Sequence, residues 1–407
     1  MTAPAAPHVL ISGGGIAGPA LAYWLNAAGW RTTVVERFAS LRDAGQNIDV
    51  RGAGREVARR MGIEQTIARH TTGEVGTEFI DADGHSVARL PADRTAVDGA
   101  TAELEILRGD LARIVHETTL PGTRYLFGDR ITKLDDRGDQ VRVRFETAGE
   151  ETFDLVVIAE GLTSRTRALA FPDARMTHLG IYMAYLTVPR TAGDNDWWRW
   201  FHAPRRRQVT LRPDSLGTIR ATLAFLSTVR GLEDLARPDQ SSVLRSTFEG
   251  AGWQTPRILN ELDTADYYFD AIGQMRLARW STGRVALLGD SAYCAAPLSG
   301  MGSSLALTGA YVLAAELVTA GAHTTAFERY ERRMRPYVAK AQKISPAVVR
   351  AAYPQTRAGI RALHVGARLA ASSPAQRLAL ADRFSAPPAD QITLPDFHPA
   401  GRVPAAS

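Results

Sequence analysis

The sequence predicts an α/β protein whose first lobe is interrupted by an inserted, sheet-rich lobe and followed by C-terminal helices. Three observations predict this fold: a strand–turn–helix–strand pattern in the first 36 residues, an aromatic-rich and strand-like stretch over residues 177–269, and a return to α/β texture at residues 283–289 before helices that run from Ser303 to about Leu380. The chain has 407 residues, 45% apolar and 22% charged, which is ordinary for a soluble globular protein with room for two lobes.

The first lobe begins with a short apolar strand over His8–Ser12 and a glycine turn over Gly13–Gly18. A helix follows over Pro19–Ala28, ends at Gly29, and leads to a β-branched strand over Thr32–Val35. Because residues 155–159 are apolar at every position, we expect a strand there that is covered on both faces. This run ends the strand expected at Phe153–Ile158, and two further strands are expected at Arg124–Phe127 and Val141–Phe145.

The inserted lobe contains strand-like segments at Gln208–Arg212 and Thr218–Phe225. In Trp197-Trp198-Arg199-Trp200-Phe201, alternate side chains face opposite ways, so some belong to the core and others could stack on an aromatic ligand. We interpret Arg205-Arg206-Arg207 as a solvated hairpin turn.

Outside the inserted lobe, the residues 325–343 alternate charge at helical spacing, which predicts a covering helix. Cys294 is interpreted as a small packing residue.

These patterns divide the chain into four parts. The first lobe takes residues 1–72, 101–175 and 276–345. The inserted lobe takes residues 73–100 and 176–275, the C-terminal helices occupy 346–385, and an irregular tail occupies 386–407.

Composition excludes several classes of protein. The formal charge is only +5 and no basic stripe is visible, so a nucleic-acid partner is not expected. The longest apolar stretch, Leu305–Val318, is shorter than the roughly 20 residues that span a bilayer, so no membrane partner is expected. The nine histidines are dispersed, so no metal site is expected. A single cysteine and a start, Met1–Pro7, without signal-peptide features predict a cytoplasmic protein.

The glycine turn indicates dinucleotide binding. Residues 13–18 fit G-x-G-x-x-G after a strand and at the start of a helix, and Glu36 follows eighteen residues beyond Gly18. The glycines allow a pyrophosphate to approach the backbone, the helix N-terminus supplies free N–H groups, and Glu36 can accept a hydrogen bond from a ribose hydroxyl.

A second motif points to a flavin nucleotide. Residues 284–292 read as a strand that ends in an acidic turn at Asp290, and residues 297–304 read as a glycine loop that opens another helix. A carboxylate on such a turn can hold a sugar-alcohol chain. The N-terminus of the following helix can stabilise negative charge on a reduced flavin ring.

With a middle motif at residues 159–167, these motifs resemble the flavoprotein aromatic hydroxylases of the para-hydroxybenzoate hydroxylase type. Within that family, the chain is most similar to the small tetracycline-inactivating and antibiotic-tailoring monooxygenases. The resemblance runs from Val9 to about Ile344 and rests on the three motifs in order. It implies a Rossmann-like FAD-binding domain with an inserted substrate-binding domain.

The resemblance also implies roles for individual residues. Gly13, Gly15 and Gly18 would face the FAD pyrophosphate, Glu36 the adenosine ribose, and Asp290 the ribityl chain. The other residues implied to contact FAD are Ile16, Ala17, Arg37, Asp49, Arg108, Glu160, Pro297, Gly300, Met301 and Gly302, and Arg42 would meet the nicotinamide cofactor. Two positions depart from the family pattern: Glu160 stands where Asp is usual, which puts its contacts in question, and Tyr293 stands where His is common.

The activity implied is that of an FAD-dependent monooxygenase, with FAD bound tightly and non-covalently. NADPH or NADH would reduce the flavin and leave, and O2 would add to give a C4a-hydroperoxyflavin that hydroxylates an aromatic or polyketide-like small molecule. No catalytic residue can be named, and a monomer or weak homodimer is expected.

Other functions remain open alternatives. Baeyer–Villiger oxidation or epoxidation could use the same peroxide, and a non-catalytic FAD-binding redox protein is kept open by Glu160. A flavin halogenase is disfavoured because Trp198-Arg199-Trp200-Phe201 is not followed by Ile-Pro. An NAD-dependent dehydrogenase would use the first motif alone.

Overall fold

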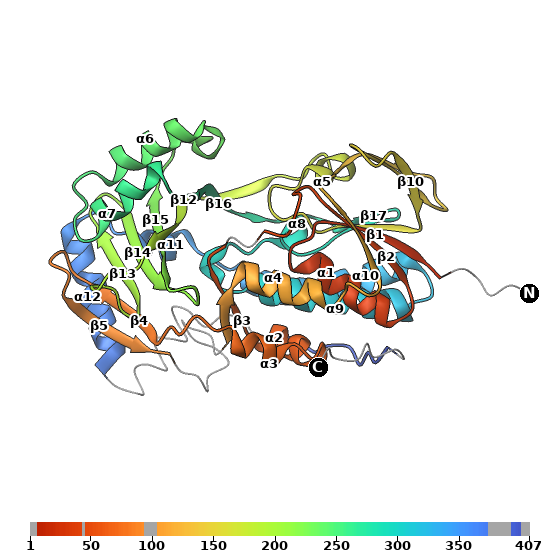
Figure 1. Ribbon diagram of the computed structural model, residues 1–407, viewed down its shortest axis with the longest axis horizontal. Coiled ribbons are helices and arrows are strands. Elements are labelled where there is room, and N and C mark those ends of the chain that lie inside the picture. Colours follow the sequence, from red (N-terminus) through yellow and green to blue (C-terminus); the bar gives the residue numbers. More distant parts are fainter. Residues whose placement is uncertain (1–5, 43–44, 93–103, 373–391, 400–407) are drawn as a thin grey trace, which may run out of the picture.

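Two lobes lie side by side and are joined by two long strands (Figure 1). The computed structural model describes residues 6–42, 45–92, 104–372 and 392–399. The connecting strands are β12 (Met176–Pro189) and β16 (Tyr267–Met275), which pair antiparallel. The lobe on the right of Figure 1 contains the N-terminal strands, and the lobe on the left contains most of the chain between β12 and β16.

The first lobe is built on a six-stranded sheet with the order β17-β18-β11-β1-β2-β7. Its pairings are parallel from β18 to β7, and β17 joins antiparallel. The inner strands are buried at almost every position, as the uniformly apolar run at 155–159 predicts. The strands are β1 (His8–Ser12), β2 (Arg31–Glu36), β7 (Thr123–Phe127), β11 (Leu155–Ile158), β17 (Ser281–Thr282) and β18 (Val285–Leu287).

Helix α9 (Gly302–Thr319) lies at the centre of this lobe and packs against α1 (Ala17–Ala27), α2 (Gly52–Arg60) and α10 (His323–Ala341). Among the described residues, α9 is the one helix long and apolar enough to cross a membrane, but 78% of it is buried inside the protein, as in a core helix. The remaining helices of the lobe are α3 (Glu64–Arg69), α4 (Arg108–Glu117), α5 (Arg165–Ala170), α8 (Asp290–Tyr293) and the 3-10 turn η3 (Pro297–Ser299).

Two small sheets complete the first lobe. One is antiparallel with the order β10-β9-β8, formed by β8 (Ile131–Asp136), β9 (Val141–Phe145) and β10 (Glu150–Phe153). The other pairs β3 (Asn47–Val50) with β6 (Leu104–Leu107) and sets Asp49 opposite Glu105. This ribbon therefore brings two carboxylates together.

The second lobe is a seven-stranded sheet with the order β16-β12-β15-β14-β13-β4-β5. Its remaining strands are β4 (Gly76–Ile80), β5 (Ser86–Pro91), β13 (Trp198–Ala203), β14 (Arg207–Pro213) and β15 (Thr218–Leu226). A second hydrophobic core joins one face of the sheet to α6 (Arg237–Phe248) and α7 (Thr255–Asn260). The short 3-10 turns η1 (Leu232–Asp234) and η2 (Glu261–Asp263) flank these helices. The other face of the sheet packs in part against Val349 and Tyr353 of the C-terminal region, and in part lines a cavity.

The C-terminal part adds α11 (Pro346–Ala352) and α12 (Arg357–Ser372), and α12 packs against β5. The segment 392–399 has no helix or strand and inserts Phe397 beside Trp24 and Tyr311 of the first lobe. The rest of the predicted tail, and residues 373–385 of the predicted C-terminal helices, lie outside the described residues.

The predicted α/β fold with an inserted sheet is confirmed, and α10 forms where a covering helix was expected. Strands of the seven-stranded sheet come from residues 76–91 and 176–275, while the exact domain boundaries stay a prediction. One expectation was wrong in part. The turn at Arg205 and Arg206 forms, but Arg207 is buried, because its guanidinium donates to the carbonyls of Pro204, Thr247 and Glu249.

Candidate functional site

A cavity of about 1110 Å³ is lined by both lobes. The first lobe contributes the glycine turn after β1, the end of β2 and the loop between α8 and α9, and the second contributes the open face of its sheet. Gly18 and Met301 do not line it. The residues predicted to contact the cofactors that do line it are Gly13, Gly15, Ile16, Ala17, Glu36, Arg37, Arg42, Asp49, Arg108, Glu160, Asp290, Pro297, Gly300 and Gly302.

Two glycines of the first turn are required by close backbone approach. Gly13 has φ +117°, and a Cβ there would lie 2.4 Å from the carbonyl oxygen of Ala159 at the end of β11. A Cβ on Gly18 would lie 2.1 Å from the carbonyl oxygen of Gly13. Gly18 therefore allows α1 to pack onto the turn, which explains why it is buried behind the cavity wall.

The glycine turn is tied to the end of β2 by Glu36. The Gly14 N–H donates to Glu36 Oε2 at 2.7 Å, and the Phe38 N–H donates to Glu36 Oε1 at 3.1 Å. Ile16, at the N-cap of α1, supplies no side-chain cap, and neither does any other described side chain. The first N–H groups of the helix are therefore available to an anion in the cavity.

Arg108 and Asp290 place opposite charges inside the cavity. A Cβ on Gly15 would lie 3.4 Å from Arg108 Nη2, so this guanidinium lies beside the glycine turn. Burial and the nearby Arg42 lower the pKa of Arg108, and Asp290 opposes that shift. Burial likewise raises the pKa of Asp290, and Arg108 opposes it. The charges of Arg108 and Asp290 thus partly stabilise each other. Because burial removes water from both groups, a polar ligand in the cavity would stabilise their charged forms further.

Glu160 directs its carboxylate back onto the protein. Its oxygens accept hydrogen bonds from the hydroxyls of Ser12 and Ser164, and from both the hydroxyl and the N–H of Thr166. These donors come from β1 and from the start of α5. The longer side chain at this departure from the family pattern therefore fixes the β11–α5 turn against β1 while lining the cavity.

The loop before α9 forms a second glycine-lined wall. Gly300 has φ +61°, and a Cβ there would lie 3.6 Å from Arg51 Nη2 and 3.8 Å from Asp49 Oδ2. Asp49 and Arg51 form an ion pair of 2.5 Å. Met301 is fully buried in the hydrophobic core, so it anchors the loop from behind.

The remaining predicted residues gather at the end of β2. The guanidinium groups of Arg37 and Arg42 each lie 4.8 Å from the centre of the Phe38 ring. All three side chains line the cavity. This arrangement presents two cations and one aromatic ring to an incoming ligand.

The second sheet lines its end of the cavity with aromatic side chains. Trp198 and Trp200 lie on one side of β13 with ring centroids 4.7 Å apart, and Phe79 of β4 lies 5.8 Å from Trp200. Phe201 points to the opposite face and is buried in the core under α6 and α7. Strand alternation thus decides the question that the sequence left open: the two tryptophans face the cavity and Phe201 is core.

His202 continues this aromatic wall. Its ring lies nearly parallel to that of Phe79, with centroids 6.2 Å apart, and its Nε2 is 3.1 Å from Gln208 Nε2. Burial lowers the pKa of His202 to about 3, so the imidazole is neutral at physiological pH. Because the Gln208 amide nitrogen is a hydrogen-bond donor, His202 Nε2 is the acceptor in this hydrogen bond.

A cluster of charged side chains that sequence reasoning missed lies in the cavity wall, between the glycine loops of the first lobe and the aromatic side chains of the second. We call it the Arg212 cluster; its members are Asp49, Arg51, Glu74, Glu105 and Arg212. Arg212 Nε donates to Glu74 Oε2 at 2.5 Å, and Arg212 Nη2 pairs with Glu105 and lies 3.8 Å from Asp49 Oδ1. Burial raises the pKa of Glu74 to about 8, although Arg212 opposes that shift. No sequence signal marks the cluster, because its members come from four separate segments.

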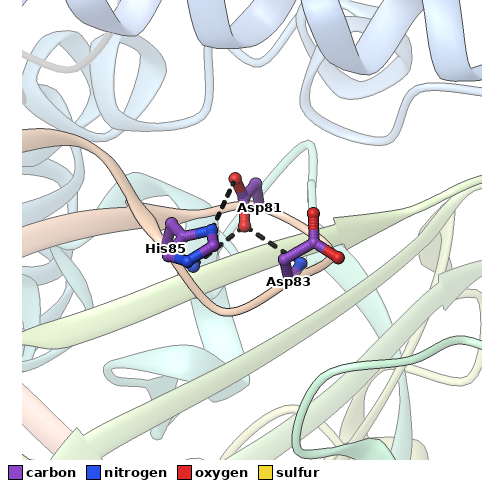
Figure 2. A group of neighbouring side chains, drawn as sticks. All are labelled: Asp81, Asp83 and His85. Atoms are coloured by element: carbon purple, nitrogen blue, oxygen red, sulfur yellow. Dashed lines mark hydrogen bonds and ion pairs between the residues drawn. The ribbon is translucent and has the colours of Figure 1, made fainter.

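One group of potential metal ligands occurs among the described residues. Figure 2 shows Asp81, Asp83 and His85 in the turn between β4 and β5. Asp81 Oδ1 accepts from the N–H groups of Asp83 at 3.0 Å and His85 at 2.8 Å. The Asp81 carboxylate therefore closes the hairpin turn, which accounts for the group without a metal.

The parallel sheet of the first lobe places two helix N-termini and two glycine loops around one cavity. This arrangement defines a two-lobed α/β protein of the dinucleotide-binding type. The chain belongs to the FAD binding domain family, whose sequence profile matches residues 7–350. It is 36% identical over 433 residues to the flavin-dependent monooxygenase eupH of a Phoma species, covering 97% of this chain and 99% of that protein. The chain is thus a flavin-dependent monooxygenase and an oxidoreductase.

Other relatives agree with this assignment. A flavin-dependent monooxygenase of Legionella longbeachae is 36% identical over 340 residues, covering 82% of this chain and 87% of that protein. The crystal structure of the tetracycline destructase Tet(51) superposes with a TM-score of 0.80 at 30% identity, covering 97% of this chain and 100% of that one. The predicted family resemblance is therefore confirmed.

Proposed function

We propose that the cavity holds FAD tightly and non-covalently, with the residues of the two glycine loops around it. Three features fit such a ligand: the N-termini of α1 and α9 open on the cavity without side-chain caps from the described residues, the glycine turn admits no Cβ at Gly13, and the partly buried, oppositely charged Arg108 and Asp290 line the same cavity.

The proposed roles follow from what each side chain can offer. Gly13, Gly15 and the first turn of α1 offer N–H groups to the pyrophosphate, and Glu36 offers a carboxylate oxygen to the ribose. Asp290 would hold the ribityl hydroxyls. The Gly300 loop and the N-terminus of α9 would lie against the flavin ring and stabilise negative charge on it.

We propose that the reaction is the hydroxylation of an aromatic or polyketide-like small molecule with NAD(P)H and O2. FAD, when bound, supplies the redox chemistry that activates O2. The observation that carries the proposal is that Phe79, Trp198 and Trp200 line the same cavity as the glycine loops. These rings can stack on a planar substrate and exclude water from the space beside the flavin site. The structural similarity to the tetracycline destructase Tet(51) supports a polyketide-like substrate.

The reductant would meet the protein at Arg37, Phe38 and Arg42. Two guanidinium groups against one ring suit a phosphorylated, aromatic nucleotide, and they favour NADPH over NADH through its 2′-phosphate. Because the reductant visits only transiently, a second dinucleotide fold is not required.

The testing experiment is an absorption spectrum of the purified protein, followed anaerobically as NADPH is added. We expect an oxidised-flavin spectrum that bleaches, and bleaches faster when an aromatic polyketide is present. Oxygen consumption with a product heavier by one oxygen atom, measured by mass spectrometry, would complete the test. A colourless protein that takes up no added FAD contradicts the proposal.

We further propose a cytoplasmic protein that acts as a monomer or weak homodimer. The buried thiol of Cys294 forms no disulfide bond, which supports a reducing compartment. Light scattering coupled to size-exclusion chromatography measures the oligomeric state, and a stable higher oligomer would contradict this part.

A further inference from the structure

The Arg212 cluster lies where the two ends of the cavity meet. The Trp198 ring stacks on the guanidinium of Arg212 at 4.1 Å, and Asp49 and Arg51 lie against the Gly300 loop. Arg212 itself lines the cavity. The cluster therefore connects the proposed flavin-ring loop to the aromatic wall where a substrate would stack.

Arg212 has one guanidinium nitrogen that no described carboxylate engages. Its Nε and Nη2 engage carboxylates, but Nη1 has no hydrogen-bond acceptor in the described part of the chain. The residue is only 9% exposed, so bulk water solvates this nitrogen poorly. A buried guanidinium edge beside a tryptophan suits a planar oxyanion on an aromatic ring.

The charge of the cluster decides whether an oxyanion is accepted. Two guanidinium groups face three carboxylates, which leaves one net negative charge when all are ionised. A single added proton makes the cluster neutral. An anionic ligand at Arg212 is repelled in the first state and accepted in the second.

Glu74 is the carboxylate that best holds this proton. Its Oε1 is buried and has no hydrogen-bond partner among the described residues. Glu105, in contrast, accepts hydrogen bonds from Asn47 at 2.9 Å and Thr72 at 2.5 Å. Asp49 Oδ1 also has no hydrogen-bond partner among the described residues, but Asp49 lies near two guanidinium groups, Arg51 at 2.5 Å and Arg212 at 3.8 Å, whereas Glu74 pairs with Arg212 alone. The direction of the Glu74 pKa shift, set by burial, agrees with this assignment.

We propose that Arg212 binds the oxyanion of a planar aromatic substrate and that this binding requires a proton on Glu74. The inference rests on the proposed function, because it takes the aromatic end of the cavity as the substrate site. The charged groups that face Glu74 are Arg212 of β14, Glu105 of β6 and Asp49 of β3, with Arg51 behind Asp49. Ligand uptake and proton uptake are then linked.

The experiment uses the full-length, FAD-loaded protein and naphthalene-2-carboxylate as the probe. Naphthalene-2-carboxamide is the neutral control of the same shape, and 2-naphthol tests whether a phenolate serves in place of a carboxylate. Calorimetric titrations in buffers with different heats of ionisation measure both the affinity and the number of protons taken up. They are run at about pH 6 and at about pH 9, on either side of the Glu74 pKa.

We expect the carboxylate to bind more tightly than the amide at about pH 6. Above about pH 8, its affinity should fall up to about tenfold for each pH unit, with proton uptake that approaches one per ligand bound. Glu74→Gln is uncharged at every pH, so it should keep the low-pH affinity at high pH and take up no proton. Arg212→Met should lose the preference for the carboxylate, but it also removes the cation that pairs with two buried carboxylates, Glu74 and Glu105, so Glu74→Gln is the decisive variant.

Glu78→Gln is the matched control, because Glu78 is a buried carboxylate of the neighbouring strand β4 that pairs with Arg89 and does not line the cavity. It should bind like the unmodified protein. Equal affinity for acid and amide, or a pH dependence that Glu74→Gln leaves unchanged, overturns the inference. A protein that holds no FAD overturns the proposed function instead, and the absorption spectrum taken before each titration separates the two failures.

Discussion

One end of the cavity is formed mainly by the main chain, and the other end is formed mainly by side chains. The proposed nucleotide end, at Gly13–Gly18 and Gly300–Gly302, presents backbone and helix N-termini, and Gly13 and Gly18 admit no Cβ. The proposed substrate end presents side chains from the second sheet, chiefly Trp198, Trp200 and Arg212. The comparison teaches that the nucleotide end is fixed by how closely main-chain segments approach, whereas the substrate end can change side chains without moving the fold.

The strongest test of this contrast is Gly18→Ala. The new methyl group would meet the backbone carbonyl of Gly13, which no rotamer change can relieve, so the turn and α1 must separate. We expect little soluble protein and no retained flavin. Yield, circular dichroism and flavin absorbance after purification measure this outcome.

The control for that change is Gly366→Ala in the middle of α12. No heavy atom lies within 4 Å of the added Cβ, so we expect normal folding and a gain of about 0.5–1 kcal/mol from helix propensity. A Gly18→Ala protein as stable as Gly366→Ala would show that the close approach at the glycine turn does not matter.

The next test separates the two faces of β13. Phe201→Ala removes a ring from the core under α6 and α7, so the free energy of unfolding should fall by about 3–5 kcal/mol. Trp200→Ala opens the cavity wall instead, so it should weaken naphthalene-2-carboxylate binding about tenfold with a smaller loss of stability. Urea denaturation and ligand titration of both variants measure the pair, and a reversed pattern would contradict the assigned strand faces.

A smaller effect is expected from Asp290→Asn at the nucleotide end. The substitution removes the charge that opposes the lowered pKa of Arg108 and weakens a proposed acceptor for the ribityl chain. We expect FAD affinity to fall by about 2 kcal/mol, measured by fluorescence titration of the apoprotein. Asp110→Asn is the control, because Asp110 pairs with Arg113 on the surface of α4, 3.1 Å away, and should leave FAD affinity unchanged.

The smallest effect is expected from Arg42→Gln. If Arg42 meets the reductant, the KM for NADPH should rise about tenfold while the KM for NADH and the flavin content stay the same. Steady-state NADPH oxidation measures it, with the surface variant Arg113→Gln as control. An equal change in both KM values would assign Arg42 to FAD binding instead.

Much of the proposed nucleotide end could be predicted from the sequence, because the spacing of glycines within one short segment determines the backbone geometry of that segment. The strand, turn and helix around Gly13–Gly18 formed as expected, and Asp290 and Arg108 line the same cavity and interact electrostatically. What the spacing did not show is that Gly18 and Met301 act from behind the wall, one by packing α1 on the turn and the other by anchoring a loop.

The sequence by itself determined the fold class, the family and the loops that surround the proposed FAD site, because each is encoded by residues near one another in the chain. Only the tertiary structure decided which aromatic side chains face the cavity, and it alone assembled the Arg212 cluster. The physical reason is that folding brings together the loop before β4, the β3–β6 ribbon and strand β14 of the other sheet. Glu74, Glu105 and Arg212 therefore become buried and acquire partners of opposite charge only after folding.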